Sequence, residues 1–99
     1  MLSIKKQIEN GTAAFALSGR LDTITAPELE EELKACLDGV SELTMDFEGL
    51  EYISSAGLRV LLLAQKTMNK QGTMKLANVN DTVMEILEVT GFASILTIE

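Results

Sequence analysis

The sequence predicts an α/β domain: a mostly parallel sheet of four to five strands, with an antiparallel N-terminal hairpin and three or more helices. Segments in which every second residue is apolar alternate with segments of helical periodicity, and this βα succession builds a parallel sheet through right-handed crossovers. Asn10-Gly11, between the first two strand segments, is the strongest short hairpin signal because both residues accept a positive φ. At 99 residues, the chain is expected to form a single domain over residues 1–99.

The hairpin strands are predicted at residues 2–8 and 12–18, where apolar residues alternate with polar or small ones. Gly19 is expected to end the second strand, which leaves residues 19–25 as a loop.

A first helix is predicted to begin after Thr25. Thr25 and Glu28 match a capping box, and Pro27 in the first turn needs no amide donor. Gly39 is the expected stop. The apolar stripe of this helix consists of Leu29, Leu33, Cys36, Leu37 and Val40. The glutamate run 30–32 lies mainly off this stripe and is interpreted as a solvated face, and Cys36 as a small buried apolar residue.

The second half of the chain continues the alternation. The remaining elements are a strand at 43–47, a helix at 56–70, a short strand at 74–79, a third helix, and a candidate fifth strand at 95–98. The third helix is expected to begin at a cap formed by Asn80 or Asp81 and to end at Gly91, with Phe92 packing back on Leu87. Val60 and Leu63 lie off the main apolar stripe of their helix and are available to a neighbouring helix or a partner.

Composition restricts the classes of partner and reaction. A net charge of −7 and a pI near 4.5 argue against nucleic acid and an anionic membrane surface. The absence of histidine removes the commonest general base and metal ligand. The single cysteine excludes an internal disulfide, and neither a signal peptide nor an apolar run long enough to span a bilayer is present. We therefore expect a cytoplasmic protein with no metal, no cofactor and no membrane insertion.

The stretch Y-I-S-S-A-G-L-R-V-L, residues 52–61, places two serines before a glycine at a predicted helix start. One serine is expected to be the N-cap. A serine nucleophile needs an adjacent base, which the lack of histidine disfavours. A phosphate acceptor is the third interpretation, because the free amides and the dipole at a helix N-terminus tolerate a phosphate. Gly57 indicates a close approach to the backbone, which we attribute to a partner.

Three motifs resemble the STAS domain of bacterial anti-sigma factor antagonists. Y-I-S-S-A-G-L-R-V-L is similar to the family signature, G-R-L-D-T-I-T-A-P-E-L to the segment leading into its first helix, and V-M-E-I-L-E-V-T-G-F to its last helix. The resemblance covers essentially the whole chain. It implies a non-enzymatic protein that binds an anti-sigma factor serine kinase, frees the sigma factor, and is released when the kinase phosphorylates one of its serines. The resemblance also implies a partner phosphatase that restores the complex.

The resemblance also implies which residues act. The family acceptor lies two residues before the motif glycine, which makes Ser55 the phosphorylation site and puts Ser54 where the family often has aspartate. The implied partner-binding residues are Asp22, Thr23, Ser54, Ala56, Gly57, Leu58 and Arg59. The alternative for Asp22 is a loop aspartate that binds backbone amides.

Two other functions stay open at this point. One is a STAS subunit that docks on the ATPase of a lipid-transport ABC system, without a phosphoswitch. The other, of a different class, is a small serine hydrolase.

Overall fold

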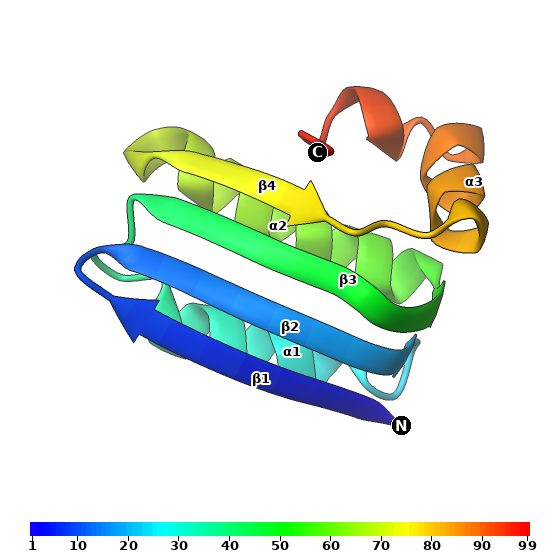
Figure 1. The fold of residues 1–99 in the computed structure, drawn as a ribbon, viewed down its shortest axis with the longest axis horizontal. Coiled ribbons are helices and arrows are strands. Elements are labelled where there is room, and N and C mark those ends of the chain that lie inside the picture. Colours follow the sequence, from blue (N-terminus) through cyan, green and yellow to red (C-terminus); the bar gives the residue numbers. More distant parts are fainter.

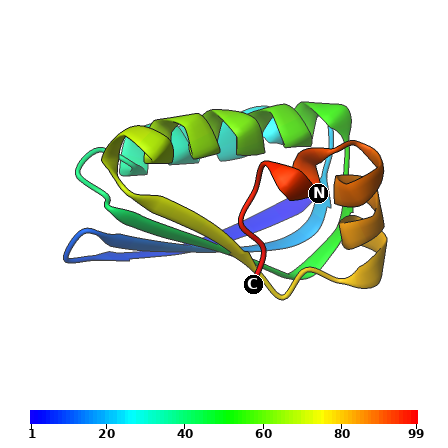
Figure 2. The ribbon, with the colours of Figure 1, turned by 90° about the horizontal axis from the view of Figure 1, so that it is seen from above.

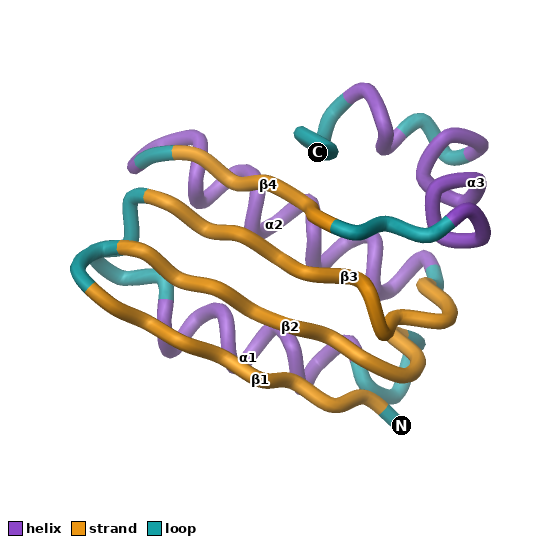
Figure 3. Tube along the Cα trace, viewed as in Figure 1, coloured by secondary structure: helices purple, strands orange, loops and turns teal.

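The computed structural model describes residues 1–99 as a four-stranded mixed sheet with helices (Figures 1 and 3). The elements are β1 (Leu2–Glu9), β2 (Thr12–Leu21), α1 (Ala26–Cys36), β3 (Glu42–Ile53), α2 (Ser55–Gln71), β4 (Thr73–Ala77), α3 (Asp81–Val89) and a 3₁₀ turn, η1 (Phe92–Ser94). The strand order is β1-β2-β3-β4; β1 and β2 are antiparallel, and the other pairs are parallel. This confirms the predicted fold class.

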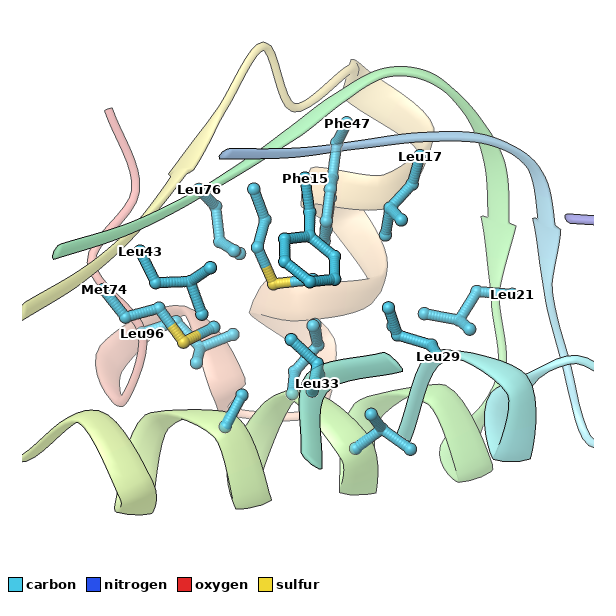
Figure 4. Packing of buried hydrophobic residues seen from close by; sticks show 14 of the residues in the cluster. Phe15, Leu17, Leu21, Leu29, Leu33, Leu43, Phe47, Met74, Leu76 and Leu96 are labelled. Carbon is cyan, nitrogen blue, oxygen red and sulfur yellow. The ribbon is translucent and has the colours of Figure 1, made fainter. Parts of the chain in front are cut away.

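Helices α1 and α2 lie side by side on one face of the sheet, while α3 lies at the end of the sheet where β3 and β4 finish (Figures 1 and 2). The core fills the space between the sheet and the two helices. Phe15 and Phe47 point into it from the strands, and Leu29 and Leu33 point into it from α1 (Figure 4). None of the helices combines the length and apolar character that crossing a bilayer requires.

The N-terminal hairpin has the predicted turn. Asn10 and Gly11 both have positive φ, 50° and 79°, as a tight turn between right-twisted strands requires. The end predicted for the second strand is wrong. β2 continues through Gly19 to Leu21, because Gly19 pairs with Leu2 on one side and Leu50 on the other.

The third strand is also longer than predicted, since β3 runs through Gly49 to Ile53. A side chain at Gly49 would place its Cβ 2.6 Å from Cβ of Ser18. The register of β2 against β3 shifts between Ala16 and Ser18 and again after Gly19. These glycines therefore mark irregularities inside two continuous strands rather than strand ends.

The C-terminal segment departs from the expected fifth strand. After α3, Gly91 is left-handed, with φ 83°, as is usual for a glycine that ends a helix, and η1 follows. The chain then makes only one isolated parallel bridge, between Ile98 and Leu76 of β4. The amides of Ile95 and Leu96 both donate to the Phe92 carbonyl, over 3.0 and 2.9 Å, so the first half of the predicted strand is used to complete the turn.

Three helix residues bear on the predicted apolar stripes: Cys36, which was expected to be buried, and Val60 and Leu63, which lie off the main stripe of α2. Cys36 is half-buried rather than buried, with Sγ 3.7 Å from Nζ of Lys6. Val60 is buried, and Leu63 stays 42% exposed beside a groove between α1 and α2.

Candidate functional site

The candidate site lies at the edge of the sheet where β2 and β3 end. Because these strands are parallel, the loop before α1 and the start of α2 emerge at the same edge (Figure 1). Leu21 pairs with Ile53 at the strand ends, and the Ser54 amide donates to the Leu21 carbonyl over 2.8 Å. The loop that follows Leu21 and the helix that follows Ser54 are thus joined at their bases.

The two serines at the start of α2 have different environments. Ser54 is the N-cap: its backbone is extended and its Oγ accepts a hydrogen bond from the Gly57 amide over 3.4 Å. Ser55 is the first helical residue, is exposed, and its hydroxyl makes no hydrogen bond within the protein. Ser54 therefore has a structural role, whereas Ser55 presents a free hydroxyl at the positive end of a 17-residue helix.

Neither serine is paired with a base. The Ser54 hydroxyl accepts from a backbone amide, and no lysine or carboxylate side chain is hydrogen-bonded to either Oγ. An activated serine nucleophile requires such a partner. The structure also has no group of three or more metal-binding side chains.

The expected role of Gly57 is corrected by the structure. Gly57 is buried, and an added Cβ would lie 2.7 Å from Cγ of Leu21 and 2.9 Å from Cγ1 of Ile53. The close approach that requires glycine is therefore made by the domain's own strands and not by a partner. Leu58 is only 4% exposed, so its side chain belongs to the core and offers no contact surface.

Two predicted partner-binding residues remain accessible on α2. Ala56 is half-buried and Arg59 is exposed. Arg59 lies four residues after Ser55, which places both side chains on one face of the helix.

The loop before α1 is held by its own side chains. Oδ1 of Asp22 accepts from the amides of Ile24 and Thr25, each over 3.0 Å. The Thr25 hydroxyl donates to the Arg20 carbonyl and accepts from the Asp22 amide, each over 2.8 Å. The predicted capping box is wrong, because Thr25 is buried and its hydroxyl is used inside the loop.

Asp22 thus forms the loop structure described by the alternative interpretation. The hydrogen bonds that it accepts from the backbone amides of Thr25 and Ile24 lower the pKa of the carboxyl group below its ordinary value of 3.8. The negative charge is stabilised by the same bonds that fix the loop.

Other loop features lie on the outside. Thr23 is exposed, and Ile24 is 82% exposed. Arg20 stacks over the ring of Tyr52, with Cζ 4.4 Å from the centroid, and its Nε lies 4.0 Å from Oδ2 of Asp22.

Sequence reasoning missed Arg20, Ile24 and Tyr52. An isolated large apolar residue within a polar loop is the signal that would have identified Ile24. Arg20 could be paired with Tyr52 only once both strands were known to extend this far.

Comparison with known proteins defines the class. The sequence model of the STAS domain matches residues 3–99, so the chain belongs to the STAS domain family. BtrV of Bordetella bronchiseptica is 38% identical over 91 residues, which cover 90% of this chain and 78% of that protein. The anti-sigma-B factor antagonist of Bacillus subtilis is 30% identical over 94 residues, covering 94% and 85% respectively.

A solved structure agrees in fold. The anti-sigma factor antagonist SpoIIAA of Bacillus has been determined in unphosphorylated and phosphorylated forms. These match with TM-scores of 0.77 and 0.75 at 17% identity, covering 98% of this chain and 87% and 91% of those chains.

Proposed function

We propose that this protein is an anti-sigma factor antagonist whose binding to an anti-sigma factor serine kinase is switched off by phosphorylation of Ser55. In this role it is a cytoplasmic regulator and the substrate of a kinase rather than an enzyme. The observation that carries the proposal is the exposed Ser55 hydroxyl, which has no hydrogen bond within the protein and lies at the start of α2. The name of the Bacillus subtilis relative and the two forms of SpoIIAA support it.

Phosphorylation at this position is compatible with an intact fold. A phosphoserine carries about −1.5 to −2 charges at pH 7. The free amides and the dipole at the start of α2 favour a negative charge there, and exposed Arg59 lies one turn further along. The added charge and volume therefore act on a docked partner, by repulsion and steric exclusion, and not on the domain itself.

Serine in place of the common family aspartate at position 54 is consistent with this switch. Both residues are strong N-caps, and Ser54 caps α2 through its hydroxyl. The start of the helix, and with it the position of Ser55, is preserved.

The test uses the wild type and three variants with the anti-sigma factor kinases encoded in the same genome. Affinity is measured by calorimetry, and phosphate is located by mass spectrometry after incubation with ATP. We expect wild type, Ser55→Ala and the control Ser54→Ala to bind, and Ser55→Asp to bind at least tenfold more weakly. Phosphate should appear on Ser55 of the wild type and on no residue of Ser55→Ala.

Two results would contradict the switch: phosphate on another residue, or equal affinity of Ser55→Asp and wild type. Binding to the ATPase of a lipid-transport system, unchanged by the charge at position 55, would instead support a docking subunit. A phosphatase that removes the phosphate and restores binding would complete the cycle.

A further inference from the structure

We propose that Ile24, at the tip of the loop formed by residues 22–25, is the apolar anchor with which the protein docks on its partner kinase. This inference rests on the proposed function and adds to it a residue outside the Ser54–Arg59 motif. It assigns to the partner an apolar pocket next to the site where Ser55 is phosphorylated.

The first argument is exposure. Ile24 is 82% exposed, and among the large apolar side chains only the N-terminal Met1 is more exposed. The Ile24 side chain is not part of the hydrophobic core. Beneath the loop, the core is formed by Leu21, Ala26 and Leu29, which are all buried. Burial of Ile24 by a partner would remove this apolar surface from water.

The second argument is rigidity. The amide of Ile24 donates to Oδ1 of Asp22, and the adjacent Thr25 is buried with its hydroxyl bonded to the Arg20 carbonyl. The loop backbone is therefore fixed before a partner arrives. A preorganised anchor loses little conformational entropy on binding, so more of its burial energy appears as affinity.

The third argument is location. Leu21 is the residue just before the loop. Its carbonyl accepts a hydrogen bond from the Ser54 amide, and its side chain packs against α2 at Gly57, where the lack of a side chain allows the close approach. A partner that reaches Ser55 at this edge of the sheet also meets the loop (Figure 1).

The surroundings of Ile24 resemble the centre of a protein interface. Asp22 and exposed Thr23 lie beside it in the loop, and Arg20 is held between the Tyr52 ring and the Asp22 carboxylate. An apolar side chain surrounded by polar and charged groups is the usual arrangement of an affinity-determining contact and its rim.

The test compares Ile24→Ser with Ile8→Ser. Ile8 is also an exposed isoleucine, 46% exposed, but it lies on β1 near the hairpin turn, at the opposite end of the sheet (Figure 1). Thermal unfolding first verifies that both variants fold. We expect Ile24→Ser to bind the cognate anti-sigma factor kinase at least tenfold more weakly than wild type, and Ile8→Ser to bind like wild type.

Phosphorylation kinetics supply a second readout. Because Ile24 takes no part in the transfer of phosphate to the Ser55 hydroxyl, its loss should raise KM for the antagonist and leave kcat unchanged. Equal affinity of Ile24→Ser and Ile8→Ser would overturn the inference. Failure of the wild type itself to bind any of the kinases would refute the proposed function instead, so the two failures are distinguishable.

Discussion

The starts of α1 and α2 share a sequence pattern and an edge of the sheet. A hydroxyl residue followed by alanine occurs at both, as Thr25-Ala26 and Ser55-Ala56, although Thr25 precedes the first residue of α1 and Ser55 is the first residue of α2. Thr25 is 4% exposed and its hydroxyl bridges the Arg20 carbonyl and the Asp22 amide. The Ser55 hydroxyl is exposed and unbonded, and capping of α2 is left to Ser54.

This difference separates a structural hydroxyl from one that is available for modification. At α1, the hydroxyl is part of the folded loop and presents Ile24 and Thr23 in one conformation. At α2, the cap and the candidate acceptor are two residues, so Ser55 can be modified without removal of the cap. Five variants test this division.

The largest effect is expected at Gly57. In Gly57→Ala, the new Cβ meets Leu21 and Ile53 below 3.0 Å, and overpacking of a close-packed core costs about 1–3 kcal/mol. We expect a loss near the upper end, about 3 kcal/mol, in urea unfolding. Leu21→Ala in the same chain should relieve the contact, so the two changes together should cost less than their sum. A stabilised Gly57→Ala protein, as helix propensity alone predicts, would contradict the packing argument.

Thr25→Val keeps the shape of the side chain and removes its hydroxyl. Two partners, the Arg20 carbonyl and the Asp22 amide, lose their hydrogen bond, and an unsatisfied buried group costs about 1–3 kcal/mol. We expect a loss of about 2 kcal/mol by chemical denaturation. Thr25→Ser, which retains the hydroxyl, is the control and should lose clearly less.

Ser54→Ala removes the cap of α2. Loss of an N-cap costs about 0.5–2 kcal/mol, and the 3.4 Å bond to the Gly57 amide is long, so we expect about 1 kcal/mol. Ser54→Asp should restore most of the stability. A Ser54→Ala loss as large as that of Thr25→Val would mean that the two helix starts are equally dependent on their hydroxyls.

The charge of Asp22 should appear in the pH dependence of stability. Because its folded pKa lies below the ordinary value of 3.8, the carboxylate stabilises the fold above that pH, and this stabilisation is lost as the pH falls through the folded pKa. The difference in unfolding free energy between wild type and Asp22→Asn should therefore be constant from pH 5 to 7 and shrink below about pH 3.8. A difference independent of pH down to 2 would contradict the loop assignment.

Ser55→Ala should have the smallest effect on stability. The hydroxyl is exposed and unbonded, and substitutions at such sites usually stay within about 0.5 kcal/mol. Thermal unfolding of wild type and Ser55→Ala should coincide closely. A loss comparable to that of Ser54→Ala would show that Ser55 also takes part in capping.

The local features of the fold could be predicted from the sequence because each depends on only a few neighbouring residues. Asn10-Gly11 determined a turn through its own conformational preferences, and of the two predicted caps of α3, Asn80 and Asp81, it is Asn80 that caps the helix. The continuation of β2 and β3 past Gly19 and Gly49 depends on pairing between residues about thirty positions apart, which local patterns do not report.

The site could be predicted only in part for the same reason. A serine before a glycine at a helix start was visible in the sequence, as was Asp22. The sequence did not show that Gly57 faces the inside of the domain, because this depends on its contacts with Leu21 and Ile53, which come from the ends of β2 and β3. The use of the Thr25 hydroxyl inside the loop, rather than at the helix end, depends on the Arg20 carbonyl, whose position follows from the extended strand.

The strand order of the sheet is the order of the strands in the chain, β1-β2-β3-β4. After the hairpin, each new strand adds to the strand made just before it, with one helix between them, as Thr12 pairs with Glu42 and Glu42 with Thr73. No strand has to insert between two that are already paired. On a ribosome, the sheet can therefore grow in one direction as the chain emerges, and an incomplete chain exposes a single growing edge.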